Sequence, residues 1–394
     1  MPAERRPPLS PPRDLTLPDP ESTTARDVLS RAIGRLVSEL HALARAPSRG
    51  ALRTILRAPA GAIASALRQP TVSVHLRCLR DRTDPARTSA ALTELLAHLS
   101  FELAIRSALP VPLRIERPPP RLLSPSARRS LSIPSDARAI TFDAGRATIH
   151  RPGVDEAIDL TGAQSSDYYP IVNHLVLALA DNNPLAMIDA HPDKQGNAID
   201  LGGHEANEWT TTLAEALDLI GQCLPDLRNE MDLFIHQIIP VGWHAERHLS
   251  ASYREAIGSI YLSLHPSLMT MVEALIHEFS HNKMNALFEL DDVLENAFTS
   301  SFASPIRPDA RPLHGVLLAV HAFLPVARLY EIMLERAHPL AGNSTFRERY
   351  DAIRAINREA ATIVLENGRP TPLGRAVLDE IDRWQHHFDS PPGV

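Results

Sequence analysis

The stretch from Leu268 to Leu290 constrains this chain most, because it predicts a buried helix that carries two histidines. Neither Pro nor Gly interrupts it, and most of its side chains are apolar, which is typical of a core helix. His277 and His281 are four residues apart, so both imidazoles lie on one face of the helix, with Glu278 beside them. This HExxH pattern lets both imidazoles reach one metal ion. The alternative is an ordinary core helix on which both histidines donate to backbone carbonyls.

A catalytic metal site needs a third protein ligand and open coordination positions. The apolar helix expected from Leu313 to Leu334 is the best source, because His314 and His321 lie seven residues apart on one of its faces. His321 is preferred, since an unpaired imidazole among apolar side chains is costly. His314 is the alternative, and either residue could instead be a core histidine bonded to the backbone. Glu295 is the ligand that a zinc protease would use, although a solvated carboxylate is the favoured interpretation.

Three cations near the motif could hold an anionic ligand. Arg307 and Arg311 precede the expected helix N-terminus, where free N–H groups and the helix dipole favour anions. Either guanidinium could clamp a carboxylate at two points. Lys283 follows the second histidine by two residues and could act as a point charge. Surface ion pairs are the alternative interpretation for all three.

The composition of the 394-residue chain limits the classes of protein to which it can belong. The formal net charge is -7, which argues against a general nucleic-acid-binding protein. Only Cys78 and Cys223 occur, without a CxxC pattern, so no disulfide framework is indicated and a reducing cytoplasm fits best. The N-terminus lacks the apolar segment of an export signal, and no run of 18 apolar residues suggests a membrane span. We therefore expect no nucleic-acid or membrane partner; the oligomeric state stays open.

The order of segments predicts a mainly α fold, a multi-helix bundle around the HExxH helix with a small β element before it. Residues 1–22 are rich in Pro and Arg and are expected to be disordered. Residues 23–134 are expected to form an N-terminal helical region and a Pro-rich linker, and residues 135–394 a metal-binding catalytic domain. Two short runs separated by DAGR, Ala139–Phe142 and Ala147–His150, predict a hairpin. Further helices are expected at Ala25–Ala44, residues 51–67, Ser89–Leu109, Tyr169–Ala180, Trp209–Cys223 and Leu227–Ile239.

Three blocks of sequence together resemble a known family. They are HEFSHNKMNAL at His277–Leu287, RPDARPLHGVLLAVHAF at Arg307–Phe323 and SASYREAIGSIYLSL at Ser250–Leu264. In this order they resemble the HExxH-motif proteins found beside ribosomally made peptide natural products. Members of that family are understood to be iron(II)- and 2-oxoglutarate-dependent peptide β-hydroxylases. The resemblance covers about Ile158 to Leu378.

The resemblance implies an enzyme that hydroxylates a side-chain β-carbon of a ribosomal precursor peptide. His277 and His281 match the metal-binding pair of the family, Glu278 its motif glutamate, and Lys283 the basic residue after the pair. The third ligand, His321 or His314, lies in a matching block. Lys283 or one of Arg307 and Arg311 would hold the distal carboxylate of 2-oxoglutarate, and Glu278 would act beside the metal as a base or as an orienting group.

Two other interpretations remain open. In a zinc metallopeptidase, Glu278 would deprotonate a zinc-bound water. No downstream ligand motif of the metzincin type is present, because Lys283 to Ala286 lacks the required Gly and His. A non-catalytic helical scaffold or peptide-binding protein with a structural HExxH is the third interpretation.

Overall fold

The structure is a computed structural model of the chain, and it describes all residues except 1–12, 81–83, 163, 189, 192–193, 304–309 and 391–394. The chain divides into two compact units, neither of which is continuous in sequence. Unit 1 comprises Met1–Leu29, Asp218–Leu233 and Leu275–Val394, and unit 2 comprises Ser30–Leu217 and Phe234–Ala274. This division does not coincide with the boundary expected at residue 134.

The N-terminal part of unit 2 is helical. α5 (Pro85–Ile105) begins at Asp84, whose carboxylate accepts hydrogen bonds from the N–H groups of Ala86 and Arg87. It packs against the shorter helices before it, and their apolar faces form one core. These helices are α2 (Gly50–Ile55), α3 (Ala60–Leu67) and α4 (Pro70–Cys78), preceded by α1 (Thr24–Ala44), which runs from unit 1 into unit 2. The helix expected at Ala25–Ala44 is thus confirmed, whereas the one expected at 51–67 is interrupted before Pro59.

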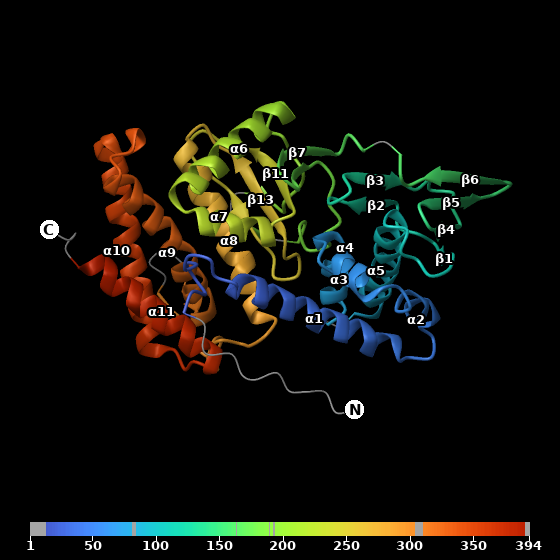
Figure 1. Ribbon diagram of the computed structural model, residues 1–394, viewed down its shortest axis with the longest axis horizontal. Coiled ribbons are helices and arrows are strands. Elements are labelled where there is room, and N and C mark those ends of the chain that lie inside the picture. Colours follow the sequence, from blue (N-terminus) through green and yellow to red (C-terminus); the bar gives the residue numbers. More distant parts are fainter. Residues whose placement is uncertain are drawn as a thin grey trace. The chain divides into compact units, whose positions relative to one another are not determined.

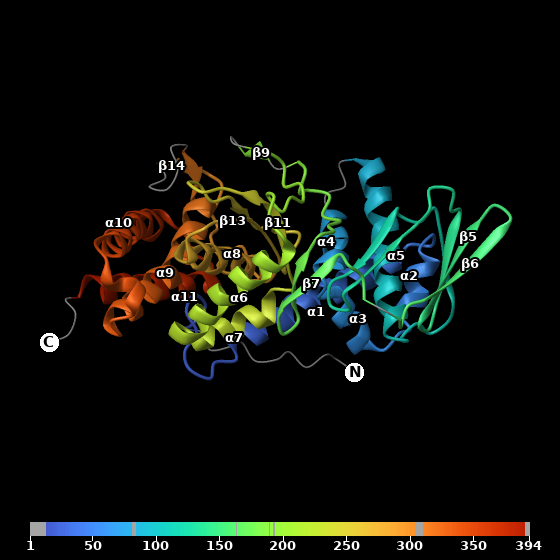
Figure 2. The same ribbon diagram turned by 90° about the horizontal axis from the view of Figure 1, so that it is seen from above.

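Antiparallel strands follow α5. A four-stranded sheet has the order β1-β4-β5-β6, and a separate hairpin joins β2 to β3. Figure 2 shows β5 and β6 side by side as a long hairpin. The predicted hairpin at DAGR is confirmed as β4 and β5, with Gly145 at φ +70 in its turn. The strands are β1 (Leu113–Glu116), β2 (Arg121–Ser124), β3 (Arg129–Ser132), β4 (Ala139–Asp143), β5 (Arg146–Arg151) and β6 (Val154–Asp159).

Unit 2 also contains a mixed five-stranded sheet with the order β12-β13-β11-β8-β7, in which β11 runs parallel to both of its neighbours. Every residue of β13 is buried, which is typical of a strand covered on both faces. The connection from β8 to β11 contains the helices α6 (Ala206–Cys223) and α7 (Pro225–Phe234). The strands are β7 (Tyr168–Val172), β8 (Leu175–Ala178), β11 (Gln237–Trp243), β12 (Ser250–Ala251) and β13 (Ser259–Leu264), and β9 (Ala190–His191) pairs with β10 (Lys194–Gln195) nearby in sequence.

The helix predicted at Tyr169–Ala180 is wrong, because this segment forms the β7–β8 hairpin. Asn173 adopts the left-handed conformation at φ 50 in the turn, which a continuous helix would not allow. Short apolar runs do not distinguish a buried strand from a helix by periodicity, and β-branched residues with a turn-forming Asn should have decided for strands. The fold is therefore mixed α/β with helices predominating, and its β structure extends beyond the single small element expected.

Unit 1 is dominated by long helices. α8 (Leu268–Phe288) enters it from unit 2, and α10 (Ser344–Asn367) lies along α9 (Leu313–Glu335), as Figures 1 and 2 show. Side-chain caps define two helix starts: Asn343 accepts from the N–H of Phe346, and Thr371 from that of Gly374. The remaining elements are α11 (Pro372–Asp389), the 3₁₀ helix η1 (Pro339–Gly342) and the strand pair β14 (Ser301–Phe302) and β15 (Arg311–Pro312).

Helix α9 is long and apolar enough to cross a membrane by length and composition alone. Most of its apolar stretch is buried inside the protein, as in the core helix of a soluble protein. Its apolar character is therefore accounted for by packing within the fold.

The N-terminal segment is partly buried in unit 1. Residues 1–12, part of the segment expected to be disordered, lie outside the described residues. Four consecutive residues within the described part, Asp14 to Leu17, are each at most 5% exposed. This short segment bears directly on the histidine site.

Candidate metal centre

Helix α8 brings the two motif histidines together as their spacing predicts. The Nε2 atoms of His277 and His281 lie 2.9 Å apart, and their ring centroids are 4.4 Å apart in an edge-on arrangement. Both side chains are partly exposed, whereas the turns of α8 around them are buried. Two imidazole nitrogens that face each other at this distance need either a shared proton or a shared cation between them.

Glu278 lies next to this pair but on a more buried side of the helix. It is 2% exposed, and one carboxylate oxygen belongs with the two histidines to a group of candidate ligand atoms that all lie within 4.8 Å of one another. A carboxylate at this position can orient or accept a proton from a molecule bound at the histidines. The sequence-predicted trio of His277, Glu278 and His281 is thus brought together.

His321 reaches the centre from α9 and is fully buried. Its Nε2 lies 3.2 Å from the carbonyl oxygen of Leu15 and is placed to donate to it. Its Nδ1 is buried and makes no hydrogen bond within the described part of the chain. Burial, together with the charges of Lys283 and His281, lowers the pKa of His321 to about 3, so the ring is neutral and Nδ1 carries a lone pair.

This arrangement of His321 is the one that metal-binding histidines use, because the nitrogen opposite the metal normally donates to a carbonyl or a carboxylate. His321 is nevertheless outside the group of ligand atoms within 4.8 Å of one another. It would have to move toward the pair to complete a three-ligand set, and its role as a ligand stays a prediction.

The alternative ligand His314 lies elsewhere. Its ring packs between Phe288, at 4.6 Å between centroids, and Phe298, at 4.9 Å. Phe288 is seven residues beyond His281 on α8, about 10 Å along the helix axis. His277 instead contacts Phe323, near the middle of α9, at 4.9 Å. The antiparallel contacts of α8 and α9 thus favour His321 over His314.

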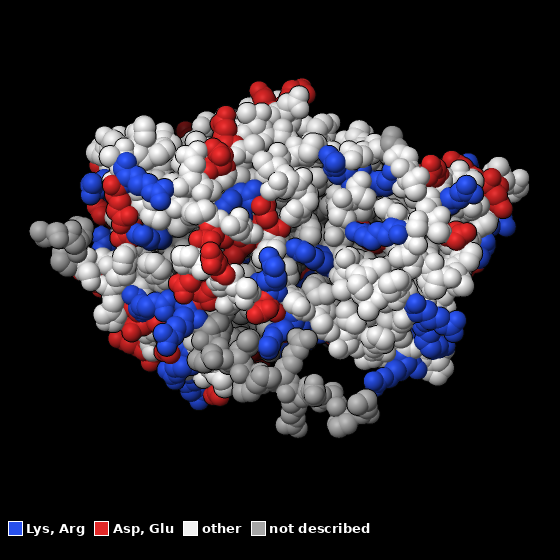
Figure 3. All heavy atoms as spheres, in the orientation of Figure 1, with Lys and Arg blue, Asp and Glu red and all other residues white. Residues whose placement is uncertain are grey.

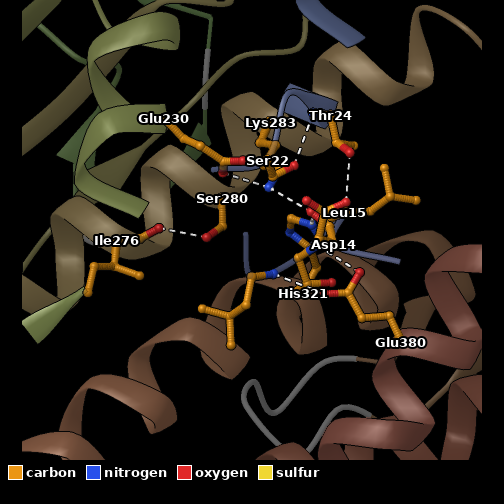
Figure 4. Close-up of polar contacts among 12 residues, drawn as sticks. Asp14, Leu15, Ser22, Thr24, Glu230, Ile276, Ser280, Lys283, His321 and Glu380 are labelled. Atoms are coloured by element: carbon orange, nitrogen blue, oxygen red, sulfur yellow. Dashed lines mark hydrogen bonds and ion pairs between the residues drawn. The ribbon is translucent and has the colours of Figure 1, made fainter. Parts of the chain in front are cut away.

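Lys283 points away from the histidine pair, since residues two apart on a helix do not share a face. Its ammonium lies 2.6 Å from the carboxylate of Glu230 on α7 and 3.4 Å from the carbonyl oxygen of Asp14, and both charged side chains are almost completely buried. Burial raises the pKa of Glu230, and the charge of Lys283 opposes that rise. Figure 4 shows this ion pair beside Asp14 and His321. A cosubstrate carboxylate would have to replace Glu230 to reach Lys283.

Arg307, Arg311 and Glu295 are the remaining candidate residues of the predicted site. Arg307 lies outside the described residues. Arg311 is in β15, paired with Phe302 of β14, directly before α9. Glu295 is exposed, and its N–H donates to the carbonyl of Arg369. Nothing in the described part of the chain brings Glu295 to the histidines, in agreement with its interpretation as a solvated carboxylate.

Sequence reasoning missed the N-terminal segment that lines this region. The N–H groups of Thr16 and Leu17 each donate to the carboxylate of Glu380 on α11, at 3.0 Å, and the carbonyl of Leu15 accepts from His321. Figure 4 shows Leu15 and Asp14 among His321, Lys283 and Glu380. The only sequence signal was the short alternation of Asp14 to Leu17 after a Pro-rich stretch, which is too brief to predict burial.

The donor set suits a divalent transition metal. Two imidazole nitrogens bound at about 2.0–2.1 Å and at a right angle to each other stand about 3 Å apart, close to the separation of the His277 and His281 nitrogens. The buried lone pair of His321 Nδ1 offers a third nitrogen donor. Imidazole and carboxylate donors are used by both zinc and iron(II), so the donor set alone does not distinguish them.

The charged side chains of both signs are visible on one face of the protein. Basic and acidic side chains are interspersed there (Figure 3), in keeping with the net charge of -7. Comparison with known protein families finds no match to this chain, and comparison with curated proteins finds none either.

Proposed function

We propose that the chain is a metal-dependent enzyme with its centre at His277 and His281, and more specifically an iron(II)- and 2-oxoglutarate-dependent hydroxylase of a ribosomal precursor peptide. The observation that supports a metal centre is the convergence of the two Nε2 atoms to 2.9 Å on one helix face. The neutral, fully buried His321 beside them supports a facial set of three side-chain ligands. The choice of hydroxylation over other reactions rests on the resemblance of the three sequence blocks.

Bound iron(II) would supply the oxidation: O₂ and 2-oxoglutarate are consumed, succinate and CO₂ are released, and one C–H of the peptide becomes C–OH. His277, His281 and His321 would hold the metal. Glu278, buried beside the pair, would orient the groups bound there through its carboxylate. Phe323 lies against His277 and would help to exclude water on that side.

The distal carboxylate of 2-oxoglutarate needs a cation. Arg311 stands in β15 directly before α9, and we propose it as a candidate beside Lys283. Lys283 is engaged with Glu230, so its participation would require that ion pair to open. We propose a cytoplasmic location, because Cys78 and Cys223 form no CxxC pattern and α9 is mostly buried in the fold.

The experiment uses anaerobically purified, iron-loaded protein with 2-oxoglutarate, O₂ and the precursor peptide encoded beside the gene. A gain of one oxygen in the peptide with a matching amount of succinate is the expected result. His281→Ala should abolish both products, whereas His386→Ala, an exposed histidine of α11, should leave them unchanged. If the folded, iron-loaded protein yields neither the oxidised peptide nor succinate, the proposed hydroxylase is overturned.

A zinc metallopeptidase is the second candidate, favoured by the closeness of the Glu278 carboxylate to both histidines. In that case Glu278 would take a proton from water, and Glu278→Gln would abolish peptide cleavage while leaving metal binding intact. Cleavage of the peptide by zinc-loaded protein, without succinate, would decide for this candidate.

A further inference from the structure

A second histidine cluster lies in unit 2, remote in sequence from the HExxH motif. His75 is on α4, and Glu94 and His98 are one turn apart on α5. Candidate ligand atoms of these three residues all lie within 4.8 Å of one another. The Glu94 carboxylate is 3.3 Å from His98 Nδ1 and 3.9 Å from His75 Nε2. Both histidines are at most 2% exposed, so the donor atoms are held by packing.

The side-chain amide of Asn182 has more possible hydrogen-bond acceptors around it than it has protons. The side-chain nitrogen of Asn182 lies 2.8 Å from the carbonyl oxygen of Thr71, 2.9 Å from His75 Nε2 and 3.0 Å from His98 Nε2. An amide NH₂ has only two protons, so it cannot donate to all three acceptors. Exchanging the amide oxygen and nitrogen would instead set that oxygen against the Thr71 carbonyl. When both Nε2 atoms are unprotonated, one acceptor in this group therefore lacks a proton, which is costly.

The contact of His98 with the backbone indicates which of its ring nitrogens carries the proton. His98 Nδ1 lies 3.0 Å from the backbone carbonyl of Glu94 and is placed to donate to it. That leaves its Nε2 as an acceptor, facing the same point in space as Nε2 of His75. Asn182 thus joins the Nε2 atoms of both imidazoles, and the Glu94 carboxylate lies 3.9 Å from Nε2 of His75 and 3.3 Å from Nδ1 of His98.

The cluster is also accessible. His75, Glu94 and Asn182 contribute to the wall of a cavity of about 780 Å³ within unit 2. An ion could enter through this cavity and keep coordination positions directed into it. A metal site requires suitable ligands, supporting hydrogen bonds and an entry path, and all three are present here.

We propose that His75, Glu94 and His98 form a second metal site, selective for a divalent transition-metal ion. Two imidazoles and one carboxylate favour zinc, cobalt or nickel over magnesium or calcium, which prefer oxygen ligands. Small side-chain rotations would bring the donors from within 4.8 Å to the spacing of about 3.3 Å that a tetrahedral ion requires. Binding would relieve the shortage of protons, because Asn182 could then donate to Thr71 without serving both imidazoles.

The test measures Co²⁺ binding to the full-length, chelator-treated chain by equilibrium dialysis and by the visible absorption of the bound ion. The His277→Ala/His281→Ala double variant removes the HExxH pair, and we expect it to retain one Co²⁺ per chain. Adding Glu94→Gln should weaken that binding at least about tenfold, and adding His98→Ala should abolish it. His150→Ala, on β5 of the same unit, is the matched control and should have no effect.

Glu94→Gln keeps the proposal testable if His98→Ala fails to fold, because the Glu94 side chain is 29% exposed and the change is nearly isosteric. Loss of all Co²⁺ binding in the double variant, or binding that Glu94→Gln leaves unchanged, would overturn this site and leave the proposed hydroxylase untouched. Conversely, a wild-type chain whose single bound ion persists in the double variant would support this site and count against a metal at the HExxH pair.

Discussion

The histidines of unit 1 come from one turn of one helix, whereas those of unit 2 come from two helices and meet a loop residue. In α8 the spacing of His277 and His281 fixes their separation, so helix geometry alone places them face to face. His75 and His98 are instead 23 positions apart and are joined by the packing of α4 on α5 and by Asn182. The first site can be recognised in the sequence, and the second only in the fold.

The surroundings of the two clusters also differ. Behind the HExxH pair lies a charged, buried network in which Lys283 pairs with Glu230. Around His75 and His98 the neighbours are the neutral amide of Asn182 and the partly exposed carboxylate of Glu94, itself a proposed ligand. A fixed charge near a metal site tunes the groups around it, whereas a neutral amide chiefly holds the ligands in place. We therefore expect reactivity in unit 1 and a more structural role for a metal in unit 2.

The largest expected effect separates the two clusters by activity. His281→Ala should lower peptide hydroxylation by at least about a thousandfold, because a metal supplies several kcal/mol of transition-state stabilisation and each 1.4 kcal/mol is about tenfold. His98→Ala should change the rate far less once the folded fraction is taken into account. Rates normalised to folded protein by circular dichroism check both. Equal losses of activity would show that the two clusters do not differ in function.

The second prediction concerns stability next to the HExxH pair. Lys283→Met leaves the buried Glu230 carboxylate without its counter-charge, which should lower the free energy of unfolding by about 3–5 kcal/mol. Arg80→Met breaks the exposed pair with Glu39, whose side chains are both 38% exposed, and should cost less than about 1 kcal/mol. Urea unfolding measures both. The Lys283→Met/Glu230→Leu double variant should recover most of the loss; no recovery would show that packing of the lysine stem, rather than charge, is responsible.

The third prediction uses the carboxylate that holds the N-terminal segment. Burial raises the pKa of Glu380 from 4.5 to about 7, although the N–H groups of Leu17 and Thr16 and the charge of Lys283 oppose this rise. Between these pH values the folded chain binds more protons than the unfolded chain, so the free energy of unfolding falls as pH rises from about 4.5 to 7. The full change is at most about 3 kcal/mol.

Glu380→Gln removes this titration. As pH rises through that window, the free energy of unfolding of the wild type should therefore fall relative to that of the variant. Urea unfolding at pH 5, 6, 7 and 8 gives the difference curve. A flat curve would mean that the Glu380 carboxylate is not held in the buried position beside Thr16 and Leu17. Glu380→Gln should leave the His75, Glu94 and His98 cluster of unit 2 unaffected.

Local patterns predicted the parts of this fold that depend on local geometry. The HExxH helix, the helix at Ala25–Ala44 and the DAGR hairpin are confirmed because spacing, caps and turn residues act within a few positions. Tyr169–Ala180 was wrong because a six-residue apolar run fits either period, and the parallel pairing of β8 with β11 was decided by residues about 60 positions away. The burial of Leu15 against His321 depends on a contact 306 positions distant, which no local pattern contains.

The same reasoning explains why the sequence did not predict the histidine cluster of unit 2. His75, Glu94 and His98 form no motif, and Glu94 with His98 alone reads as an ordinary i,i+4 pair on a helix. The long-range contact of Asn182 turns these separate side chains into a cluster.

The smallest expected effect tests that contact directly. Asn182→Ala removes the only amide that reaches both imidazoles and the Thr71 carbonyl among the described residues, and buried acceptors left without a donor should lower the free energy of unfolding by about 1–3 kcal/mol. Asn207→Ala, an exposed position on α6, is the matched control and should stay within about 0.5 kcal/mol.

Adding Co²⁺ then distinguishes a metal site from a purely structural polar network. If the two imidazoles bind the ion, it takes the place of the N–H donor that Asn182→Ala removed, so the stability lost in metal-free protein should be partly regained at saturating Co²⁺. A purely structural network would show the same loss with and without the ion. Because the HExxH pair would also respond to Co²⁺, the comparison belongs in the His277→Ala/His281→Ala background, where only the unit 2 cluster can account for a regain.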